Sequence, residues 1–323
     1  MENYDDVVLT TRIRLARNVK GYNFTNNMID KQKQELLDYI KDRLGNSYNV
    51  LELNNMDDVT KKSLVETHII SKELLLNNNT AIIVDEKNKI TTMLNEEDHF
   101  RIQALENAFN IDKAYENIKK VDEDFSSKIE YAYNDDYGYI TACPTCLGTG
   151  MRVSVMLHLP ALEKIGALEK IFNEISGLGI AIRGIYGENT SGEGSIFQIS
   201  NQKTLGIEEE QIIEQVKQVT KYIVKQERKA REIIKTKLEV KDEIMRSLGV
   251  AKYSILMTKK EAMQILSNIR LGINMDIISD ISLDKINNII EGIGINTLRK
   301  NLKDNFPREE ENIKRAEYIK NNI

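Results

Sequence analysis

Apolar and polar residues alternate with a period of two in several stretches of the first 206 residues. A period of two is the spacing of a half-buried strand, whereas apolar residues three or four apart indicate a helix. The alternating stretches are VVLTTRIRL (7–15), TAIIVDE (80–86), KITTML (89–94), YGYITAC (137–143), MRVSVMLHL (151–159), GIAIRGIYG (179–187) and SIFQIS (195–200). Helical spacing is found at 30–44, at roughly 100–127 and at 160–177. Because strands follow one another with short connections, the pattern predicts an α+β fold, with an antiparallel or mixed sheet and helices against one face.

The alternation stops near residue 207, and the rest of the chain carries only helical spacing. Apolar residues at 212, 216, 219 and 223 share one helical face. Thr258 and Glu261 have the spacing of a capping box, before a helix that we expect to end at Gly272. We therefore expect two domains, 1–225 with the sheet and an all-helical 226–323. The apolar stripe of the helical domain fits core packing, and its alternative is a homodimer interface.

Composition narrows the class of protein. Of 323 residues, 41% are hydrophobic and 29% are charged, which is typical of a soluble globular protein. The net charge of −5 argues against a nucleic-acid binder, which needs a basic surface. No apolar run is long enough to cross a membrane, and the acidic start MENYDDVV lacks the apolar segment of a signal peptide. With two cysteines no disulfide framework is expected, and the predicted compartment is the cytoplasm.

Arginines occupy positions where a strand normally carries uncharged residues. In the first predicted strand, Arg12 and Arg14 project from the same face and repel each other unless an anion lies between them. Arg152 opens a second strand, Arg183 interrupts a third, and Arg101 follows an acidic cluster. A solvated edge strand would explain the first pair alone. Because guanidinium groups suit phosphate oxygens and no Gly-Lys-Ser/Thr phosphate loop is present, several such arginines together indicate a cage for a triphosphate.

Two groups of carboxylates accompany the arginines. The cluster NEEDH (95–99) follows a predicted strand, and Glu188 lies in the glycine-rich segment 187–195. The ordinary interpretations are a solvated turn or helix start for the first and a hairpin loop for the second. Carboxylates can also bind a guanidinium through paired hydrogen bonds and orient its nitrogen for attack. Together with the arginines, they predict phosphoryl transfer to a guanidino group.

Five segments, in order along the chain, resemble those of the phosphagen (guanidino) kinases: TTRIRLARN, NEEDHFRIQ, CPTCLGTGMRVSV, RGIYGE and GSIFQISNQKTLG. The sequence is most similar to the bacterial protein arginine kinases, which use ATP to phosphorylate arginine side chains in proteins. This resemblance implies a phosphagen-kinase-type catalytic domain followed by an all-α domain. Small-molecule members carry a helical domain before the first arginine strand, which here begins near residue 7. The protein kinases of the family carry theirs after the catalytic domain.

The resemblance also implies roles for individual residues. Glu97 would be the catalytic base, Glu188 would help to hold the guanidinium, and Cys143 would position the acceptor nitrogen. His68 matches the adenine-contacting histidine of the family, although by itself it fits a structural histidine. Mg²⁺ would enter with ATP, held by phosphate oxygens and waters, and segment 187–195 would close over the site. The residues implied in ATP binding are Thr10, Thr11, Arg12, Ile13, Arg14, His68, Arg101, Arg152, Val153, Ser154, Val155, Met156, Arg183, Gly184, Ile185, Tyr186, Gly187 and Glu188.

The sequence departs from the family pattern at two places. Cys146 stands where the family has asparagine, so we expect altered local hydrogen bonding there. Near the C-terminus, Glu311 and Asn312 replace the arginine and aspartate of a phosphoarginine-binding motif, while Arg315 and Ala316 remain. These replacements argue against activation through a phosphoarginine pocket of the usual kind.

Three other functions fit parts of the sequence. A kinase for a free guanidino metabolite such as arginine would use the same site. A thiol–disulfide oxidoreductase would use Cys143 and Cys146, but it explains neither the arginines nor the acidic cluster. A catalytically inactive adaptor conflicts with the presence of every site residue. By resemblance, the partners would be proteins with exposed arginines, a zinc-binding activator, a transcriptional repressor and a Clp-type protease, in protein quality control and the stress response.

Overall fold

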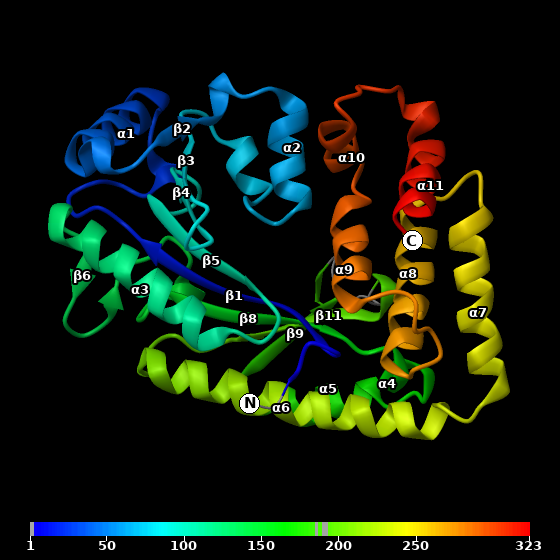
Figure 1. Ribbon diagram of the computed structural model, residues 1–323. Coiled ribbons are helices and arrows are strands. Elements are labelled where there is room, and N and C mark those ends of the chain that lie inside the picture. The colour runs from blue at the N-terminus through cyan, green and yellow to red at the C-terminus, as the bar shows by residue number, and fades with distance from the viewer. Residues whose placement is uncertain (1–2, 185–186, 189–192) are drawn as a thin grey trace.

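A computed structural model describes residues 3–184, 187–188 and 193–323. Within these residues a nine-stranded sheet has the order β10-β9-β11-β8-β1-β5-β4-β3-β2, and every neighbouring pair is antiparallel (Figure 1). The strands are β1 (Val8–Arg17), β2 (Val50–Glu52), β3 (Ala81–Asp85), β4 (Ile90–Leu94), β5 (Phe100–Asn107), β8 (Met151–His158), β9 (Ile180–Gly184), β10 (Gly187–Glu188) and β11 (Ile196–Asn201). A short ribbon pairs β6 (Tyr133–Asn134) with β7 (Gly138–Tyr139).

The alternation of the sequence sets the two faces of this sheet. In β1, Ile13 and Leu15 are buried on one face, and Arg12 and Arg14 occupy the other. The helices on the apolar side include α1 (Asp30–Leu44), α3 (Ile111–Lys128) and α6 (Glu209–Ile234) (Figure 1). Helix α3 packs on β1 and β5, and α6 packs on β8 and β11. The α+β prediction is therefore confirmed, and the apolar face of the sheet is covered by amphipathic helices.

Three of the sequence predictions need correction. Residues 100–107 form β5 and not the start of a helix, because Phe100 and Ile102 point to the core while Arg101 points to the other face. Of 137–143, only Gly138–Tyr139 is strand, and the rest is loop. Residues 160–177 form two helices, α4 (Pro160–Lys164) and α5 (Leu168–Ser176), which are separated at Gly166, a residue with a φ of 69°.

The C-terminal part of the chain is helical, as predicted. After α6, the helices stand at one end of the sheet (Figure 1). They are α7 (Leu238–Tyr253), α8 (Lys259–Asn274), α9 (Leu283–Gly292), α10 (Ile295–Leu302) and α11 (Glu311–Asn322). The Thr258 hydroxyl caps α8 by accepting the Glu261 amide at 3.2 Å. No helix among the described residues is long and apolar enough to span a bilayer.

The helical part and the sheet share one apolar core, which runs from Val7 to Ile319. Polar contacts also connect them. The carbonyl oxygens of Asp5 and Asp6, just before β1, accept hydrogen bonds from the buried Arg270 of α8 at 2.7 and 2.9 Å. On the other side of the sheet, helix α2 (Asp58–Glu66) lies against α10 (Figure 1). The sheet and the C-terminal helices therefore form one packed body.

Candidate active site

The five predicted arginines lie on one face of the sheet, spread over four strands. Arg14 of β1 is directly opposite Arg152 of β8, and residues directly opposite in an antiparallel pair share a face. Arg101 of β5 shares this face through its register with β1, and Arg12 lies two residues before Arg14. Arg183 of β9 shares it through β11, where it is opposite Gln198. We call this surface the arginine face.

Few acceptors within the described residues satisfy the guanidinium groups of Arg12, Arg14, Arg101 and Arg152. Arg12 donates to the Gln198 Oε1 at 2.9 Å, and Arg152 donates to the Ser200 hydroxyl at 3.2 Å. Arg101 forms an ion pair with the buried Glu96. The buried Nε of Arg14 has no hydrogen-bond partner among the described residues. An unsatisfied buried donor beside several like charges is costly unless an anion completes the site.

Burial, followed by the charges of neighbouring arginines, lowers the pKa values of Arg12, Arg14 and Arg152. Burial, followed by the charges of Arg101 and Arg152, lowers the pKa of Arg12 to about 10. Burial and the same neighbours, with Arg12, hold the pKa of Arg14 well below its usual value, although the side chain keeps some accessible surface. Burial and the charge of Arg183 lower the pKa of Arg152. A polyanion bound to this face would reduce the electrostatic repulsion between the arginines.

The residues implied in ATP binding divide between the two faces. Thr10, Ser154 and Met156 lie on the arginine face by register. Four others, by contrast, are buried at 7% exposure or less on the opposite, apolar face: Thr11, Ile13, Val153 and Val155. The structure therefore does not bring these four side chains to the arginines, because neighbouring residues of a strand point in opposite directions.

The end of β9 is described in part. Gly184 ends the strand, and β10 pairs back on it, with Gly187 opposite Gly184 and Glu188 opposite Arg183. This register places the backbone of Glu188 beside an arginine of the site. Ile185, Tyr186 and the side chain of Glu188 lie outside the described part of the chain.

The acidic cluster forms the tight connection between β4 and β5. Asn95 has a φ of 60°, and its side-chain amide donates to the Lys33 and Asn79 carbonyls. Glu96 is buried on Arg101, and Asp98 and His99 are also buried. Glu97 is the exposed residue of this connection. Burial and the charges of Asp98 and Glu96 raise the pKa of Glu97, as suits a base that must accept a proton.

Asp98 ties the cysteine loop to the acidic cluster. Its Oδ1 accepts the Asn18 side-chain amide at 2.6 Å and the Ala142 backbone amide at 2.7 Å. Burial outweighs these two hydrogen bonds and raises the pKa of Asp98. Ala142 directly precedes Cys143, and Asp98 directly follows Glu97. The hydrogen bond between Ala142 and Asp98 therefore holds the cysteine loop close to Glu97. Cys143 is thus one residue away from Ala142, whose amide is bound by Asp98.

Both cysteines are free thiols. The Cys143 Sγ lies 3.0 Å from the Thr145 hydroxyl, and the Cys146 amide donates to the Cys143 carbonyl at 3.0 Å. Burial and the neighbouring Cys143 raise the pKa of Cys146. Cys143 is therefore part of the loop beside the arginine face, and Cys146 is a half-buried neighbour with an unreactive protonated thiol.

His68 lies near the arginine face in a left-handed backbone conformation with a φ of 59°. Its carbonyl accepts the Gln103 side-chain amide at 2.8 Å, and Gln103 is opposite Arg14 in the sheet. Local desolvation and the charges of Arg12, Lys259 and Lys72 lower the pKa of His68 to about 4, although the residue keeps an exposed surface. A neutral, accessible imidazole at this position is suited to contact a base or sugar.

Arg315 is far less available than the arginines of the sheet. It is buried, and it donates to the carbonyls of Ile293 and Met257 at 3.0 Å each and to the Asn312 side chain at 2.8 Å. Asn312, one of the residues that depart from the family motif, thus satisfies the arginine itself. Arg315 fits a structural role in joining α11 to the rest of the helical part.

Several residues that line or support the site were missed from the sequence. Gln198 and Ser200 bind arginines directly, and Gln103 connects β5 to His68. The first two are the polar positions of the alternating stretch 195–200, so its period of two could have placed them on the arginine face. Gln103 could not be found in this way, because its strand was predicted as helix.

No group of three or more His, Cys, Asp or Glu side chains in the described part of the chain is arranged to hold a metal ion.

Comparison with known proteins gives consistent results. Residues 27–230 match the family model described as ATP:guanido phosphotransferase, C-terminal catalytic domain, and residues 237–323 match the Protein-arginine kinase McsB C-terminal domain. A protein-arginine kinase of Clostridium acetobutylicum is 41% identical over 99% of this chain and 96% of its own length. One from Caldanaerobacter subterraneus subsp. tengcongensis is 39% identical over 99% and 98%.

Solved structures give the same fold. The duplicated taurocyamine kinase from Schistosoma mansoni aligns with a TM-score of 0.61 and 26% identity, over 68% of this chain and 32% of that one. A lombricine kinase aligns with a TM-score of 0.61 and 23% identity, over 69% and 67%. The second similarity, at this identity, concerns the fold alone.

Proposed function

Since this chain belongs to the protein-arginine kinases of the ATP:guanido phosphotransferase family, we propose that it transfers the γ-phosphoryl group of ATP to arginine side chains of proteins. The product is phosphoarginine. The observation that carries this proposal is the arginine face, where guanidinium groups from β1, β5, β8 and β9 share one side of the sheet. Among the described residues, Glu96 is the one carboxylate that forms an ion pair with Arg12, Arg14, Arg101 or Arg152. That arrangement fits a polyanion such as a triphosphate.

The arginine face supplies the electrostatic part of the reaction. Arg12, Arg14, Arg101, Arg152 and Arg183 hold the phosphate oxygens and offset the charge that develops on the transferring group. These arginines lie on strands of one sheet, so the backbone positions that carry them are already fixed before the nucleotide binds. Burial, followed by the charges of neighbouring arginines, lowers the pKa values of Arg12, Arg14 and Arg152, so these three side chains favour an anion as partner.

The carboxylates act on the acceptor. Glu97 and Glu188 hold the substrate guanidinium, and Cys143 helps to position its reacting nitrogen. That nitrogen attacks the γ-phosphorus, forming the N–P bond. The bond from the γ-phosphorus to the β,γ-bridging oxygen breaks, ADP leaves with the electron pair, and the proton of the nitrogen passes to Glu97. Mg²⁺ bound to the phosphates would neutralise part of their charge.

The finer assignments belong to the same proposal. Thr10, Ser154, Met156 and His68 contact the nucleotide from the arginine face, and residues 187–195 close over the site. Residues 1–225 carry catalysis, and residues 226–323 serve dimerisation and recognition of substrate or phosphoarginine. The protein works in the cytoplasm, in protein quality control and the stress response. Its partners include a zinc-binding activator, a transcriptional repressor and a Clp-type protease.

The acceptor test separates a protein kinase from a kinase for free arginine. The protein is incubated with ATP and Mg²⁺ and with either a mixed protein substrate or free arginine, and phosphoarginine is measured by mass spectrometry. We expect acid-labile phosphate on protein arginines and slow turnover of the free amino acid. Rapid turnover of free arginine with unmodified protein would overturn the proposal.

The role of the arginine face is tested with a matched pair of variants. Arg14→Gln removes a guanidinium that has no partner within the described residues, whereas Arg308→Gln changes an exposed arginine in the helical part. Arg14→Gln should lower kcat/KM for ATP roughly 10²-fold or more, by analogy with the loss of one transition-state donor. Arg308→Gln should leave it unchanged. Equal activity of both variants would remove Arg14 from the site.

A further inference from the structure

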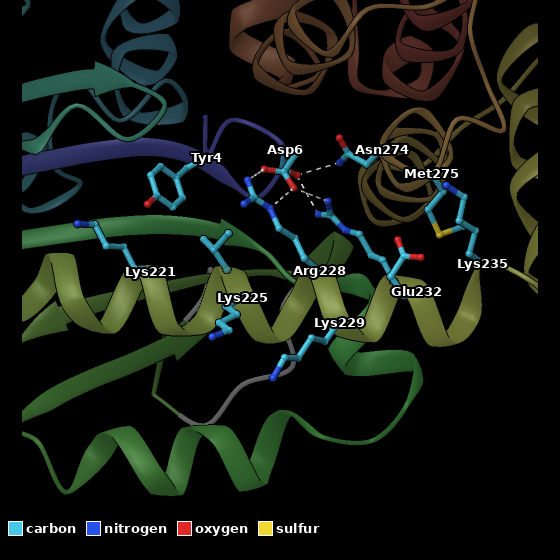
Figure 2. A pocket seen from close by; sticks show the side chains of 12 residues that line it. Tyr4, Asp6, Lys221, Lys225, Arg228, Lys229, Glu232, Lys235, Asn274 and Met275 are labelled. Atoms are coloured by element: carbon cyan, nitrogen blue, oxygen red, sulfur yellow. Dashed lines mark hydrogen bonds and ion pairs between the residues drawn. The ribbon is translucent and has the colours of Figure 1, made fainter. Parts of the chain in front are cut away.

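A groove of about 730 Å³ lies between the N-terminal segment, α6 and the end of α8 (Figure 2). Because α6 packs on the apolar face of β8 and β11, the groove is separated by the sheet from the arginine face. Basic side chains dominate its lining. They are Lys221, Lys225, Arg228, Lys229, Arg231 and Lys235, and the acidic residues of the lining are Asp6 and Glu232.

Three of these lysines form a row along α6. Lys221, Lys225 and Lys229 are four residues apart, all three are exposed, and none has an ion pair or side-chain hydrogen bond in the described part of the chain. Like charges four apart on a helix repel each other. The helix dipole accounts for basic residues only in the last turn, and Lys221 lies more than three turns before Ile234. We call these residues the lysine row.

The groove already binds one carboxylate. The side chain of Asp6 accepts from Arg228 at 2.7 and 3.0 Å and from Arg231 at 2.7 Å, as the dashed lines of Figure 2 show. Lys235 is paired with Asp276 at 3.3 Å. The internal contacts therefore occupy the arginines and the last lysine, and they leave the lysine row for a ligand from outside.

We propose that the lysine row docks an extended acidic segment of a partner protein, with carboxylates at alternate positions. Residues four apart on a helix are separated by about 6 Å along its axis, and alternate residues of an extended chain are separated by about 6.7 Å. Three successive carboxylates on one side of such a segment therefore match three lysines.

A protein segment is favoured over a nucleic acid. The chain as a whole carries a net charge of −5, which repels a long polyanion, and polynucleotide binding requires a broad basic surface. A short acidic segment meets only the local positive charge of the groove. The complementarity is of the kind that sets partner choice and association rate, so it should weaken with salt.

The test uses a fluorescent peptide of alternating aspartate and threonine and the full chain. The charge-reversed variant carries Lys221→Glu, Lys225→Glu and Lys229→Glu. The control carries Lys87→Glu, Lys237→Glu and Lys241→Glu, which make the same change in net charge at exposed lysines elsewhere. We expect affinity to fall roughly tenfold or more in the first variant, and to be nearly kept in the control. A Lys→Gln triple variant at the lysine row repeats the test without charge reversal, and thermal unfolding of each variant verifies its fold.

The same assay includes a peptide of equal composition with its aspartates in one block, a thymidine oligonucleotide and anionic phosphatidylserine vesicles. Preference for the alternating peptide supports the docking of an extended acidic segment. Unchanged binding by the two lysine-row variants, equal binding of the block peptide, or stronger binding of the oligonucleotide or vesicles would overturn it. None of these outcomes depends on kinase activity, so the proposal stands or falls apart from the proposed reaction.

Discussion

Glu97 is the exposed member of a cluster whose other residues are buried and hydrogen-bonded to the frame of the protein. Asn95 fixes the turn, Glu96 neutralises Arg101, and Asp98 holds the cysteine loop. Four polar residues in one sequence motif therefore have four different tasks. Of the four, Glu97 alone is exposed, which makes it the candidate for the catalytic base.

The first prediction concerns this carboxylate. Glu97→Gln keeps the shape and removes the base, so kcat for arginine phosphorylation should fall about 10²- to 10⁴-fold. Since the pKa of Glu97 is raised, the acid limb of the wild-type pH profile should lie above the usual range of a glutamate. Phosphoarginine formation measured against pH checks both points. Glu86→Gln, at an exposed turn, is the control, and full activity of Glu97→Gln would exclude it as the base.

His99 has a structural task within the same cluster. Its Nδ1 accepts the Val19 amide at 2.9 Å, so the proton lies on Nε2, which donates to the Asn23 carbonyl at 2.8 Å. Burial, only partly offset by the hydrogen bond to Asn23, lowers the pKa of the ring to about 4. The folded state therefore requires the neutral form.

The second prediction follows from this requirement. In the unfolded chain a histidine titrates near a pKa of about 6.5, so it takes up a proton before the folded one does. The stability from neutral His99 is complete above that pH and is lost as pH falls through about 4, with a total of about 3 kcal/mol. Urea unfolding between pH 7 and pH 4.5 should show a smaller pH slope for His99→Gln than for wild type. His158, which is also buried and neutral, contributes equally to both. Identical slopes would contradict the assignment.

Among the elements, β5 shows where local pattern misleads. Its length and spacing are compatible with a helix, but β1 and β4 lie on both sides of it and supply its hydrogen bonds. Pairing with distant strands decided the conformation, as is usual for central strands. Because residues 100–107 were expected to be helical, their pairing with β1, which places Arg101 and Gln103 on the arginine face, was not predicted.

Helices α2 and α10 meet through one carboxylate. Glu66, the last residue of α2, accepts the backbone amides of Asn296 and Thr297 at 3.1 and 2.8 Å and the side chains of both. It serves as the N-terminal cap that α10 lacks in its own sequence. A Cβ at Gly294 would lie 2.4 Å from the Glu66 carboxylate, so only glycine fits there.

The third prediction tests this cap. Glu66→Ala should lower the free energy of unfolding by about 1–3 kcal/mol, because it leaves the donors of α10 unsatisfied. Glu35→Ala, on an exposed face of α1, should change it by less than about 0.5 kcal/mol. Chemical denaturation of the two variants gives the comparison. A loss of equal size in both would show that the cap contributes nothing.

At the scale of the whole molecule, the N-terminal segment joins the sheet to the C-terminal helices. Arg270 is fully buried, and it binds the Asp5 and Asp6 carbonyls, the His158 ring and the Asn287 side chain. Arg228 and Arg231 of α6 bind the Asp6 side chain in addition. Residues more than 200 positions apart in the sequence therefore belong to one polar network.

The fourth prediction is that Arg270→Leu loosens this joint. The variant leaves the Asp5 carbonyl and the His158 ring without their donor and removes one of the three donors of the Asp6 carbonyl, so stability should fall by about 3 kcal/mol or more. The C-terminal helices should then exchange amide hydrogens faster than the central strands. Arg246→Leu removes an arginine that is 77% exposed, and it serves as the control. Unchanged exchange in the Arg270 variant would contradict its role as the joint.

The sequence by itself determined the parts whose signal is local. Period-two alternation placed most strands and put Arg12 and Arg14 on one face, since side-chain direction alternates along any strand. The capping spacing of Thr258 and Glu261 placed the start of α8, because the hydrogen bond of an N-cap joins residues three positions apart. The ordered motifs were enough to indicate the family and the reaction.

Only the tertiary structure decided what the strands bring together. The order of the sheet sets Arg14 against Arg152 and Arg183 against Gln198, and packing against the helices buries the face that carries Thr11, Ile13, Val153 and Val155. Packing buries Asn95, Glu96 and Asp98 and leaves Glu97 exposed. It also buries Arg315 within the helical part. These outcomes depend on register and packing between segments far apart in the chain, and no local pattern encodes which distant partner a residue will meet.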